Sequence, residues 1–285
     1  MHRGRFAPSP TGSLHIGSLV AAVGSWLFAR ARSGRWIVRI EDLDHVPEVP
    51  GATDAILRTL AAHGLESDEE VVRQSARTDA YEAALQRLAA AGHAYRCWCS
   101  RADLAAFAGI HPHECVAGPA ARPPAWRVRA GHAKLRLDDA VQGAVTQDLR
   151  REVGDFVVWR ADGACAYQLA VVVDDEAQRI THVVRGADLI DSTPRQILLQ
   201  WLLGYAQPVY AHLPLVLGAD GRKLSKHEAA LAVDAADPLP ALRAALRFLG
   251  QPVPRSGSAA ILLSQAARGF DAGRIPRAAS AAPSL

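Results

Sequence analysis

Apolar residues near the N-terminus recur every three or four positions, which is the spacing of a helix. They are Leu19, Val20, Val23, Trp26 and Leu27. Three later stretches have boundaries typical of helices and lie at residues 53–63, 77–91 and 193–203. In the last of these we expect Thr193 to cap the helix and Pro194 to be the first helical residue.

Short runs rich in β-branched and aromatic residues alternate with these helices. They cover residues 36–40, 156–159, 169–173 and 180–184, and each predicts a strand. Alternating strands and helices are typical of a parallel sheet covered by helices, so the expected fold class is α/β. Between residues 95 and 151 the pattern changes to short strands with Pro and Gly, which predicts an insertion between two halves of the sheet.

Composition limits the classes of protein that need to be considered. A chain of 285 residues that is 49% hydrophobic can bury a full core in one body with an insertion. No apolar run reaches the roughly 18 residues of a membrane span, and the first residues lack the apolar segment of a secretory signal, so we expect a cytoplasmic protein. The net charge of +3 excludes a protein that is basic over its whole surface but permits a local basic face for a nucleic acid.

Lysine is rare in this chain, with three lysines against 29 arginines, and two of them lie close together at Lys223 and Lys226. An ammonium group is a compact charge on a flexible stem and can follow a phosphate as its geometry changes. Gly218 and Gly221 just upstream supply turn residues that a closing loop needs. The segment therefore predicts a mobile phosphate clamp, with a solvated basic turn as the alternative.

A second candidate phosphate site lies near the N-terminus, between an extended segment and the first helix. Pro8, Pro10 and Gly12 force a turn, after which the free backbone N–H groups of the helix can face an anion. His15 would add a side-chain donor there, and Gly17 would let a flat base lie against bare backbone.

Three cysteines cluster inside the expected insertion, at Cys97, Cys99 and Cys115. Disulfides are rare in the cytoplasm, and the three thiolates with one imidazole would make a closed, structural zinc site. His111 precedes Cys115 by four residues and would share a helical face with it, whereas His113 is the competing fourth ligand. Three buried thiols without a metal are the alternative.

The turn and the lysine segment resemble the HIGH and KMSKS motifs of class I aminoacyl-tRNA synthetases. Further matches narrow the resemblance to the glutamyl branch of that family and fall in the order that the branch shows. The matching segments are RFAPSPTG at 5–12, HIGS at 15–18, RIED at 39–42, AYQLAVVVDD at 166–175, VRGADL at 184–189 and RKLSKH at 222–227. The resemblance implies a Rossmann-like parallel sheet with a zinc-bearing insertion and a short C-terminal helical remainder.

Glutamate carries two carboxylates and one ammonium, so its pocket needs two cationic forks and one anion. Arg5 and Arg185 would supply the forks, and Glu41 would supply the anion. The resemblance implies the following site residues: Arg5, Ala7, Ser9, Glu41, Tyr167 and Arg185 for glutamate; His15, Gly17, Ser18 and Lys226 for ATP; and His15, Lys223 and Lys226 for catalysis. Mg²⁺ would accompany ATP. Ser18 replaces the second His of HIGH, and His111 stands where this branch usually has Tyr.

Five aspartates in or near the motifs are a separate question. They are Asp42, Asp44, Asp174, Asp175 and Asp188. Because Mg²⁺ in such sites is coordinated mainly by substrate phosphates and water, we interpret these residues as helix caps and ion-pair partners.

Residues 228–285 leave no room for an anticodon-binding domain of ordinary size. The resemblance therefore narrows to the short glutamyl-queuosine tRNA(Asp) synthetases, and it implies ATP, L-glutamate and queuosine-bearing tRNA(Asp) as partners of a monomer. The expected division is 1–94 for the first half-sheet, 95–151 for the zinc-bearing insertion, 152–238 for the second half, 239–273 for a helical remainder and 274–285 for a flexible tail. The alternatives are a glutamyl-tRNA synthetase charging a tRNA 3′ end, a non-catalytic tRNA-binding paralogue and a small-molecule nucleotidyltransferase.

Overall fold

A five-stranded parallel sheet forms the centre of the computed structural model, which describes residues 2–43, 48–132, 134–218, 233–278 and 280–281. The strand order is β10-β9-β1-β2-β3. The strands are β1 (Arg3–Phe6), β2 (Arg35–Ile40), β3 (Val72–Arg73), β9 (His182–Gly186) and β10 (Val209–Leu213). This architecture confirms the α/β fold class expected from the alternating pattern.

The two halves of the sheet meet where β1 pairs with β9, in parallel and with Gly4 opposite His182. On one side the chain adds β2 and β3, and on the other it adds β10. The direction of strand addition therefore reverses between β1 and β9. In open parallel sheets, such a reversal leaves a crevice outside the carboxyl ends of the strands, where ligands bind.

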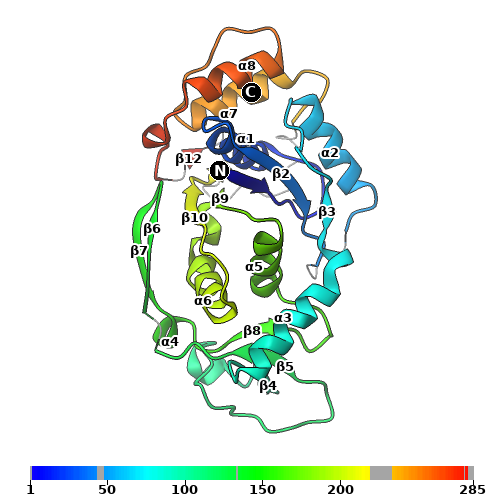
Figure 1. Cartoon of the computed structure of the whole chain (residues 1–285), viewed down its shortest axis with the longest axis vertical. Helices are drawn as coiled ribbons and strands as arrows, with labels where there is room; N and C mark the ends of the chain where they lie inside the picture. Colours follow the sequence, from blue (N-terminus) through cyan, green and yellow to red (C-terminus); the bar gives the residue numbers. More distant parts are fainter. Residues whose placement is uncertain (1, 44–47, 133, 219–232, 279, 282–285) are drawn as a thin grey trace.

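One face of the sheet is covered by α1 (Ile16–Arg30), against which α7 (Pro238–Phe248) and α8 (Ala259–Arg268) pack (Figure 1). The predicted helical stripe of α1 is buried in this layer, together with Ile56 and Leu60 of α2 (Ala52–Ala62). Within residues 274–285, for which the composition predicts no packing, Ile275 is buried against the same layer and β12 (Ser280–Ala281) pairs with β11 (Val216–Leu217). Packed structure therefore continues past residue 273, into the segment whose composition predicts a flexible tail.

The opposite face is covered by α3 (Thr78–Ala90), α5 (Tyr167–Ala177) and α6 (Thr193–Leu203). Successive strand residues point to opposite faces, so Ile37 and Val183 join the core cluster on this side while Val38 and Val184 join the other. Both faces of the parallel sheet are thereby buried, as its near-continuous apolar strands require.

The prediction of a strand at residues 169–173 is wrong, because this segment lies inside α5. The helix is buried on all sides, and Val171, Val172, Val173, Asp174 and Asp175 are all buried. A helix without a solvent face has no amphipathic period, and its consecutive β-branched residues favour a strand by local propensity. Tertiary burial decides the outcome against that propensity.

The predicted cap of α6 is also wrong, by one residue. Ser192 occupies the N-cap position, and Thr193 and Pro194 both lie inside the first turn. The Thr193 hydroxyl accepts a hydrogen bond from Arg185 Nη2 at 2.9 Å instead of capping the helix. The hydroxyl therefore serves as a hydrogen-bond acceptor for the buried Arg185 guanidinium.

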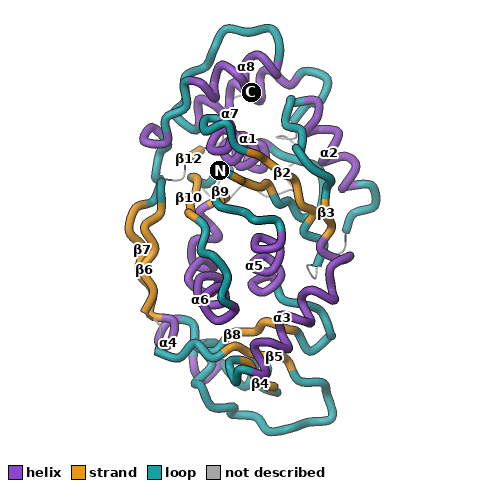
Figure 2. The backbone as a smooth tube through the Cα atoms, in the orientation of Figure 1, coloured by secondary structure: helices purple, strands orange, loops and turns teal. Residues whose placement is uncertain are grey.

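The insertion forms a three-stranded antiparallel sheet of β4 (Ala94–Cys97), β5 (Ala125–Val128) and β8 (Phe156–Trp159) (Figure 2). β8 follows the expected boundary at residue 151 and nevertheless pairs with β5. A hairpin of β6 (Lys134–Asp139) and β7 (Gly143–Asp148) precedes the short α4 (Leu149–Glu152). The hairpin returns to the central sheet, where the Ala140 N–H donates to the Tyr210 carbonyl at 2.9 Å.

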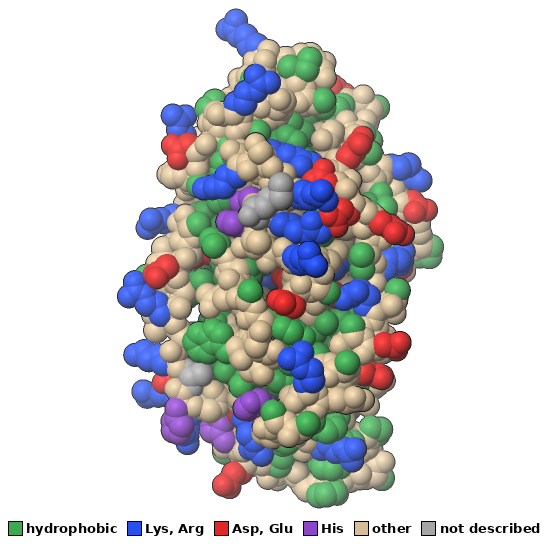
Figure 3. Space-filling view, in the orientation of Figure 1, with side chains coloured by type: hydrophobic (Ala, Val, Ile, Leu, Met, Phe, Trp, Pro, Cys, Tyr) green, Lys and Arg blue, Asp and Glu red, His purple; other side chains and the backbone are tan. Residues whose placement is uncertain are grey.

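Basic and acidic side chains are interspersed over the face shown in Figure 3, in keeping with the small net charge of +3. Among the helices of the described residues, none combines the length and the hydropathy that crossing a membrane requires.

Two neighbouring residues of α8 test whether the C-terminal helices belong to the folded core. Leu262 is fully buried whereas Ile261 is 54% exposed. We expect Leu262→Ala to lower the free energy of unfolding by about 2–5 kcal/mol, because it leaves a cavity in the layer of α1. Ile261→Ala is the matched control and should change it by less than about 0.5 kcal/mol. Equal effects in urea denaturation would contradict the packing of α8 as part of this core.

Candidate functional site

A cavity of about 400 Å³ opens at the carboxyl ends of β1 and β9, where the two half-sheets meet. All of the predicted glutamate and ATP residues within the described part of the chain line it: Arg5, Ala7, Ser9, His15, Gly17, Ser18, Glu41, Tyr167 and Arg185. The predicted Lys223 and Lys226, and also Asp44, lie outside the described residues. The structure therefore brings the described candidates together, and their individual roles stay predictions.

The HIGH-like segment forms the N-terminus of α1, with His15 as its N-cap. His15 Nδ1 accepts a hydrogen bond from the Gly17 N–H at 3.1 Å, and Nε2 lies 3.1 Å from Ser18 Oγ. An accepting Nδ1 leaves a neutral ring with its proton on Nε2, so the ring remains a donor. A Cβ on Gly17 would lie 3.0 Å from His15 Cε1, so a side chain there would displace the imidazole.

Arg5 is buried on β1 and is held by a carboxylate of α5. Its Nε lies 3.2 Å from Asp175 Oδ1, and Arg39 Nη1 donates to the same oxygen at 2.8 Å. Burial alone would raise the pKa of Asp175, but the Arg5 and Arg39 guanidinium groups hold it below its ordinary value. The ionised Asp175 therefore fixes the orientation of the Arg5 fork.

Glu41 follows β2 directly and is held by the fully buried Arg39, whose Nη2 donates to Glu41 Oε1 at 2.9 Å. Burial raises the pKa of Glu41, and Arg39 and Arg5 offset this only in part. A cation that entered the cavity beside Glu41 would favour its ionised form. The site is thus suited to a ligand that carries an ammonium group.

Arg185, on β9, supplies the second buried guanidinium group of the cavity. Its Nε donates to His212 Nε2 at 3.1 Å, its Nη2 to Thr193 Oγ1 at 2.9 Å and its Nη1 to the Tyr167 hydroxyl at 3.3 Å. Two oriented forks and one buried carboxylate in a single cavity can bind a ligand with two carboxylates and an ammonium.

The interpretation of the aspartates as ion-pair partners is confirmed for three of them. Asp42 pairs with Arg73 at 3.1 Å, and Asp174 pairs with Arg77 at 2.5 Å. Asp175 pairs with Arg5 and Arg39, while Asp188 lines the cavity.

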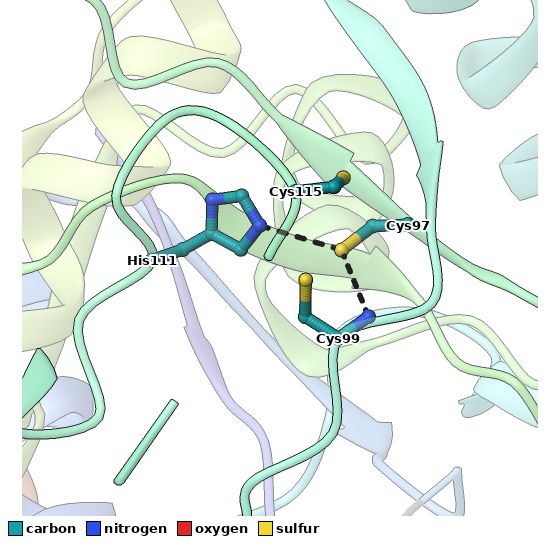
Figure 4. A group of neighbouring side chains, drawn as sticks. All are labelled: Cys97, Cys99, His111 and Cys115. Carbon is teal, nitrogen blue, oxygen red and sulfur yellow. Dashed lines mark hydrogen bonds between the residues drawn. The ribbon is translucent and has the colours of Figure 1, made fainter. Parts of the chain in front are cut away.

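The cysteine cluster of the insertion comes together as Cys97, Cys99, His111 and Cys115, whose ligand atoms all lie within 4.8 Å of one another (Figure 4). His111 Nε2 lies 3.4 Å from Cys97 Sγ. Tetrahedral zinc with Zn–S bonds of about 2.3 Å needs sulfur atoms about 3.8 Å apart, so the donor set fits this ion in kind and spacing.

The predicted helical face shared by His111 and Cys115 is wrong, because the segment is an irregular loop. His111 instead bridges to Gly154, which has a φ of 69° and where a Cβ would lie 2.4 Å from the His111 carbonyl oxygen. The competing His113 points elsewhere and lies 2.9 Å from Asp155 Oδ1 through its Nδ1. A close backbone contact that only glycine permits therefore places His111 at the cluster.

No motif in the sequence gives a site role to Arg39, His212 or Asp139. Arg39 binds Glu41, and His212 links Arg185 to Asp139. One signal was available, since Arg39 and His212 each interrupt a run of apolar residues in a buried strand. A polar side chain at such a position must be paired, but the partner lies far away in the sequence and no local pattern identifies it.

Comparison with protein families gives a match to the class I tRNA synthetase (E and Q) catalytic domain over residues 2–110 and 111–258. A crystal structure of a glutamate tRNA ligase from Elizabethkingia meningosepticum, in complex with its amino acid, superposes with a TM-score of 0.83 at 25% identity and covers 99% of this chain and 67% of that one.

Two relatives of similar length carry the same name. The Glutamyl-Q tRNA(Asp) synthetase of Xanthomonas campestris pv. campestris is 59% identical, covering 98% of this chain and 95% of the relative. The protein of the same name from Pseudomonas aeruginosa is 53% identical, covering 97% of this chain and 96% of its own length. The chain therefore belongs to the class I glutamyl and glutaminyl tRNA synthetase catalytic domain family.

Proposed function

We propose that the protein uses ATP to activate L-glutamate as glutamyl-adenylate and transfers the glutamyl group to queuosine in the anticodon of tRNA(Asp). The observation that carries the proposal is the pair of buried forks, Arg5 and Arg185, that share one cavity with Glu41 beside the N-terminus of α1. Relatives at 53–59% identity, named as Glutamyl-Q tRNA(Asp) synthetases, support the choice of acceptor.

In this proposal Arg5 and Arg185 bind the two carboxylates of glutamate, and Glu41 binds its ammonium. Ser9 and Tyr167 add hydroxyl contacts, and Ala7 lines the same wall. Aspartate is shorter by one methylene and cannot engage both forks at once. The pocket would therefore reject aspartate by leaving buried polar groups without a partner.

Activation is an in-line attack by a glutamate α-carboxylate oxygen on the α-phosphorus of ATP. The new carboxylate oxygen to phosphorus bond forms as the bond from that phosphorus to the bridging oxygen breaks, which releases pyrophosphate. The attacking group is already anionic, so no general base is needed, and the chain contributes orientation and charge stabilisation. His15 and the N–H groups of α1 hold the phosphates on one side, with Gly17 and Ser18 beside them and Lys223 and Lys226 on the other side. Mg²⁺ would be bound with ATP and would neutralise phosphate charge.

Transfer follows by attack of a queuosine hydroxyl on the carbonyl carbon of the mixed anhydride. The new ester bond forms, the bond from carbonyl carbon to phosphate oxygen breaks, AMP leaves and the hydroxyl proton passes to solvent. Arg5, Arg185 and Glu41 keep the glutamyl group in place between the two steps.

The four donors Cys97, Cys99, His111 and Cys115 would hold Zn²⁺ as a structural ion. The set is closed, with four protein ligands and no open position for a substrate, which is typical of structural zinc sites. None of the four lines the cavity described above.

The proposal also divides the chain into regions. The two half-sheets lie at 1–94 and 152–238, and the insertion lies between them at 95–151.

The acceptor is tested by finding where labelled glutamate ends up. Enzyme, ATP and labelled glutamate are incubated with tRNA(Asp) that contains or lacks queuosine, and separately with tRNA(Glu). We expect label only in the anticodon fragment of queuosine-containing tRNA(Asp). Label at the 3′ end of tRNA(Glu) would replace the proposal with a glutamyl-tRNA synthetase, and no glutamate-dependent exchange of pyrophosphate into ATP would favour a non-catalytic paralogue.

The lysine clamp is tested with the third lysine of the chain as the control. Lys226→Ala should slow glutamate-dependent pyrophosphate exchange by roughly a hundredfold, because its charge is assigned to phosphates whose charge develops in the transition state. The KM for glutamate should change little. Lys134→Ala, on the β6–β7 hairpin, should leave the rate unchanged, and an equal effect of both substitutions would refute the assignment.

The metal site is tested with a pair of histidines two positions apart. We expect about one equivalent of zinc by elemental analysis, and loss of both the metal and thermal stability in Cys97→Ser and His111→Ala, because structural zinc contributes folding free energy. His113→Ala should keep the metal, since His113 pairs with Asp155. A stable, metal-free protein would overturn the assignment. Loss of zinc in the His113 variant alone would show that His113, not His111, is the fourth ligand.

A further inference from the structure

A chain of buried hydrogen bonds runs from Arg185 out of the cavity and ends in the insertion. Arg185 Nε donates to His212 Nε2 at 3.1 Å, and His212 Nδ1 lies 2.6 Å from Asp139 Oδ2. The side chains of His212 and Asp139 are both fully buried. Asp139 is the last residue of β6, so this chain joins the β6–β7 hairpin to the second fork of the pocket.

The surroundings of Asp139 keep it ionised and acting only as an acceptor. Its Oδ1 accepts the backbone N–H groups of Val141 at 3.0 Å, Gln142 at 2.8 Å and His212 at 3.0 Å. Burial alone would raise the pKa of Asp139, but the His212 side chain and the backbone N–H groups of Gln142 and His212 hold it below its ordinary value. The proton between the two side chains therefore belongs to His212 Nδ1.

A proton on Nδ1 of a neutral imidazole leaves Nε2 as a lone-pair acceptor. Burial is the largest influence on His212 and lowers its pKa, and the Arg185 and Arg5 charges act in the same direction against the carboxylate of Asp139. His212 is therefore neutral near pH 7, and its Nε2 can accept the hydrogen bond from the Arg185 Nε–H.

The hairpin is also attached to the strand that carries His212. The Gln142 side-chain amide donates to the His212 carbonyl at 2.8 Å, and the Ala140 N–H donates to the Tyr210 carbonyl at 2.9 Å. These contacts hold the turn that follows Asp139 against β10. A rotation of the imidazole away from Arg185 would therefore break its hydrogen bond to an Asp139 that is itself held in place.

We propose that His212 and Asp139 are positioning residues that fix the rotation of the Arg185 guanidinium and so set the affinity of the pocket for glutamate. The inference rests on the proposed function and deepens it. A guanidinium binds a carboxylate through a planar fork, so a rotation about its axis misaligns both hydrogen bonds at once. The insertion thereby contributes to amino acid binding through one buried carboxylate.

Asp139→Asn tests the chain of hydrogen bonds with little change in shape. The asparagine oxygen can still accept the backbone N–H groups, but its NH₂ then faces His212 Nδ1 and requires the tautomer with the proton on Nε2. That proton could be accepted by Thr193 Oγ1, which lies 3.1 Å from Nε2, but the Arg185 Nε–H would lose its acceptor. Asp138→Asn is the matched control. Asp138 precedes Asp139 on the same strand, but its side chain is exposed and pairs with Arg136.

Two substitutions at His212 separate its two ring nitrogens. His212→Asn places its amide near the Nδ1 position, which keeps a donor for Asp139 and removes the acceptor of Arg185. His212→Gln reaches the Nε2 position and can offer its oxygen to Arg185. Rescue by Gln but not by Asn is a result that a merely structural role of His212 would not produce.

The experiment measures glutamate-dependent exchange of pyrophosphate into ATP, with glutamate and ATP varied separately. We expect Asp139→Asn and His212→Asn to raise the KM for glutamate about tenfold or more, as loss of a charged hydrogen bond predicts, with an unchanged KM for ATP. Asp138→Asn should match the wild type, and His212→Gln should stay within about threefold of it.

Direct observation of the imidazole provides a readout that does not depend on activity. Nitrogen NMR of histidine-labelled protein should show the proton of His212 on Nδ1 in the wild type and on Nε2 in Asp139→Asn. A wild-type KM for glutamate in a folded variant with the switched tautomer would overturn the inference while the proposed function stands. Absence of exchange in the wild type would instead overturn the proposed function. If Asp139→Asn does not fold, equal KM values for glutamate in His212→Asn and His212→Gln overturn the inference.

Discussion

The arrangement of the cavity depends on Arg39, a fully buried guanidinium held between carboxylates of two elements. It donates to Glu41 beyond β2 and to Asp175 on α5, and it lies 3.7 Å from Asp174. A buried charge is tolerated only when it is paired and hydrogen-bonded, so none of these groups can be removed without leaving the others uncompensated. Asp175 in turn orients Arg5, and Glu41 faces the cavity. One ion network therefore fixes the anionic group and the first cationic fork of the pocket in a single geometry.

The two forks are held from different parts of the chain. Arg5 is held by α5, within the parallel α/β body, whereas Arg185 is held through His212 by Asp139 of the insertion hairpin. A pocket for a ligand with two carboxylates concentrates positive charge. Asp175 pairs directly with Arg5, whereas Asp139 is linked to Arg185 through His212. This arrangement places both guanidinium groups in the lining of the cavity. It also makes the geometry of the pocket depend on the docking of the hairpin against β10.

The sequence predicts those features whose cause is local. The stripe of Leu19, Val23 and Leu27 predicts α1, because small residues separate the large apolar ones and keep the helical spacing visible although the helix is buried from Ala22 to Ala29. The cysteine spacing predicts the metal cluster in kind. Residues 169–173 mislead because α5 is also buried and its consecutive valines, Val171 to Val173, favour a strand by local propensity. The choice of His111 over His113 depends on a backbone contact with Gly154, and the partner of His212 is Asp139, 73 residues earlier. Such contacts between distant segments are set by tertiary packing, and no local pattern encodes them.

The surroundings of the cysteine cluster explain why the loops that carry it would need a metal for stability. The buried apolar cluster around it contains only Cys97, Cys99 and Leu104 among the described residues, with Tyr95 and Ala117 packed against it. So small a core cannot offset the conformational entropy lost by the surrounding loops. An ion bound by four side chains supplies cross-links where apolar burial is insufficient. Because β8 also carries the chain from this sheet toward α5, an ordered insertion is a condition for the placement of Tyr167 at the cavity and of Asp175 against Arg5. The metal would therefore act on the pocket through folding and not through chemistry.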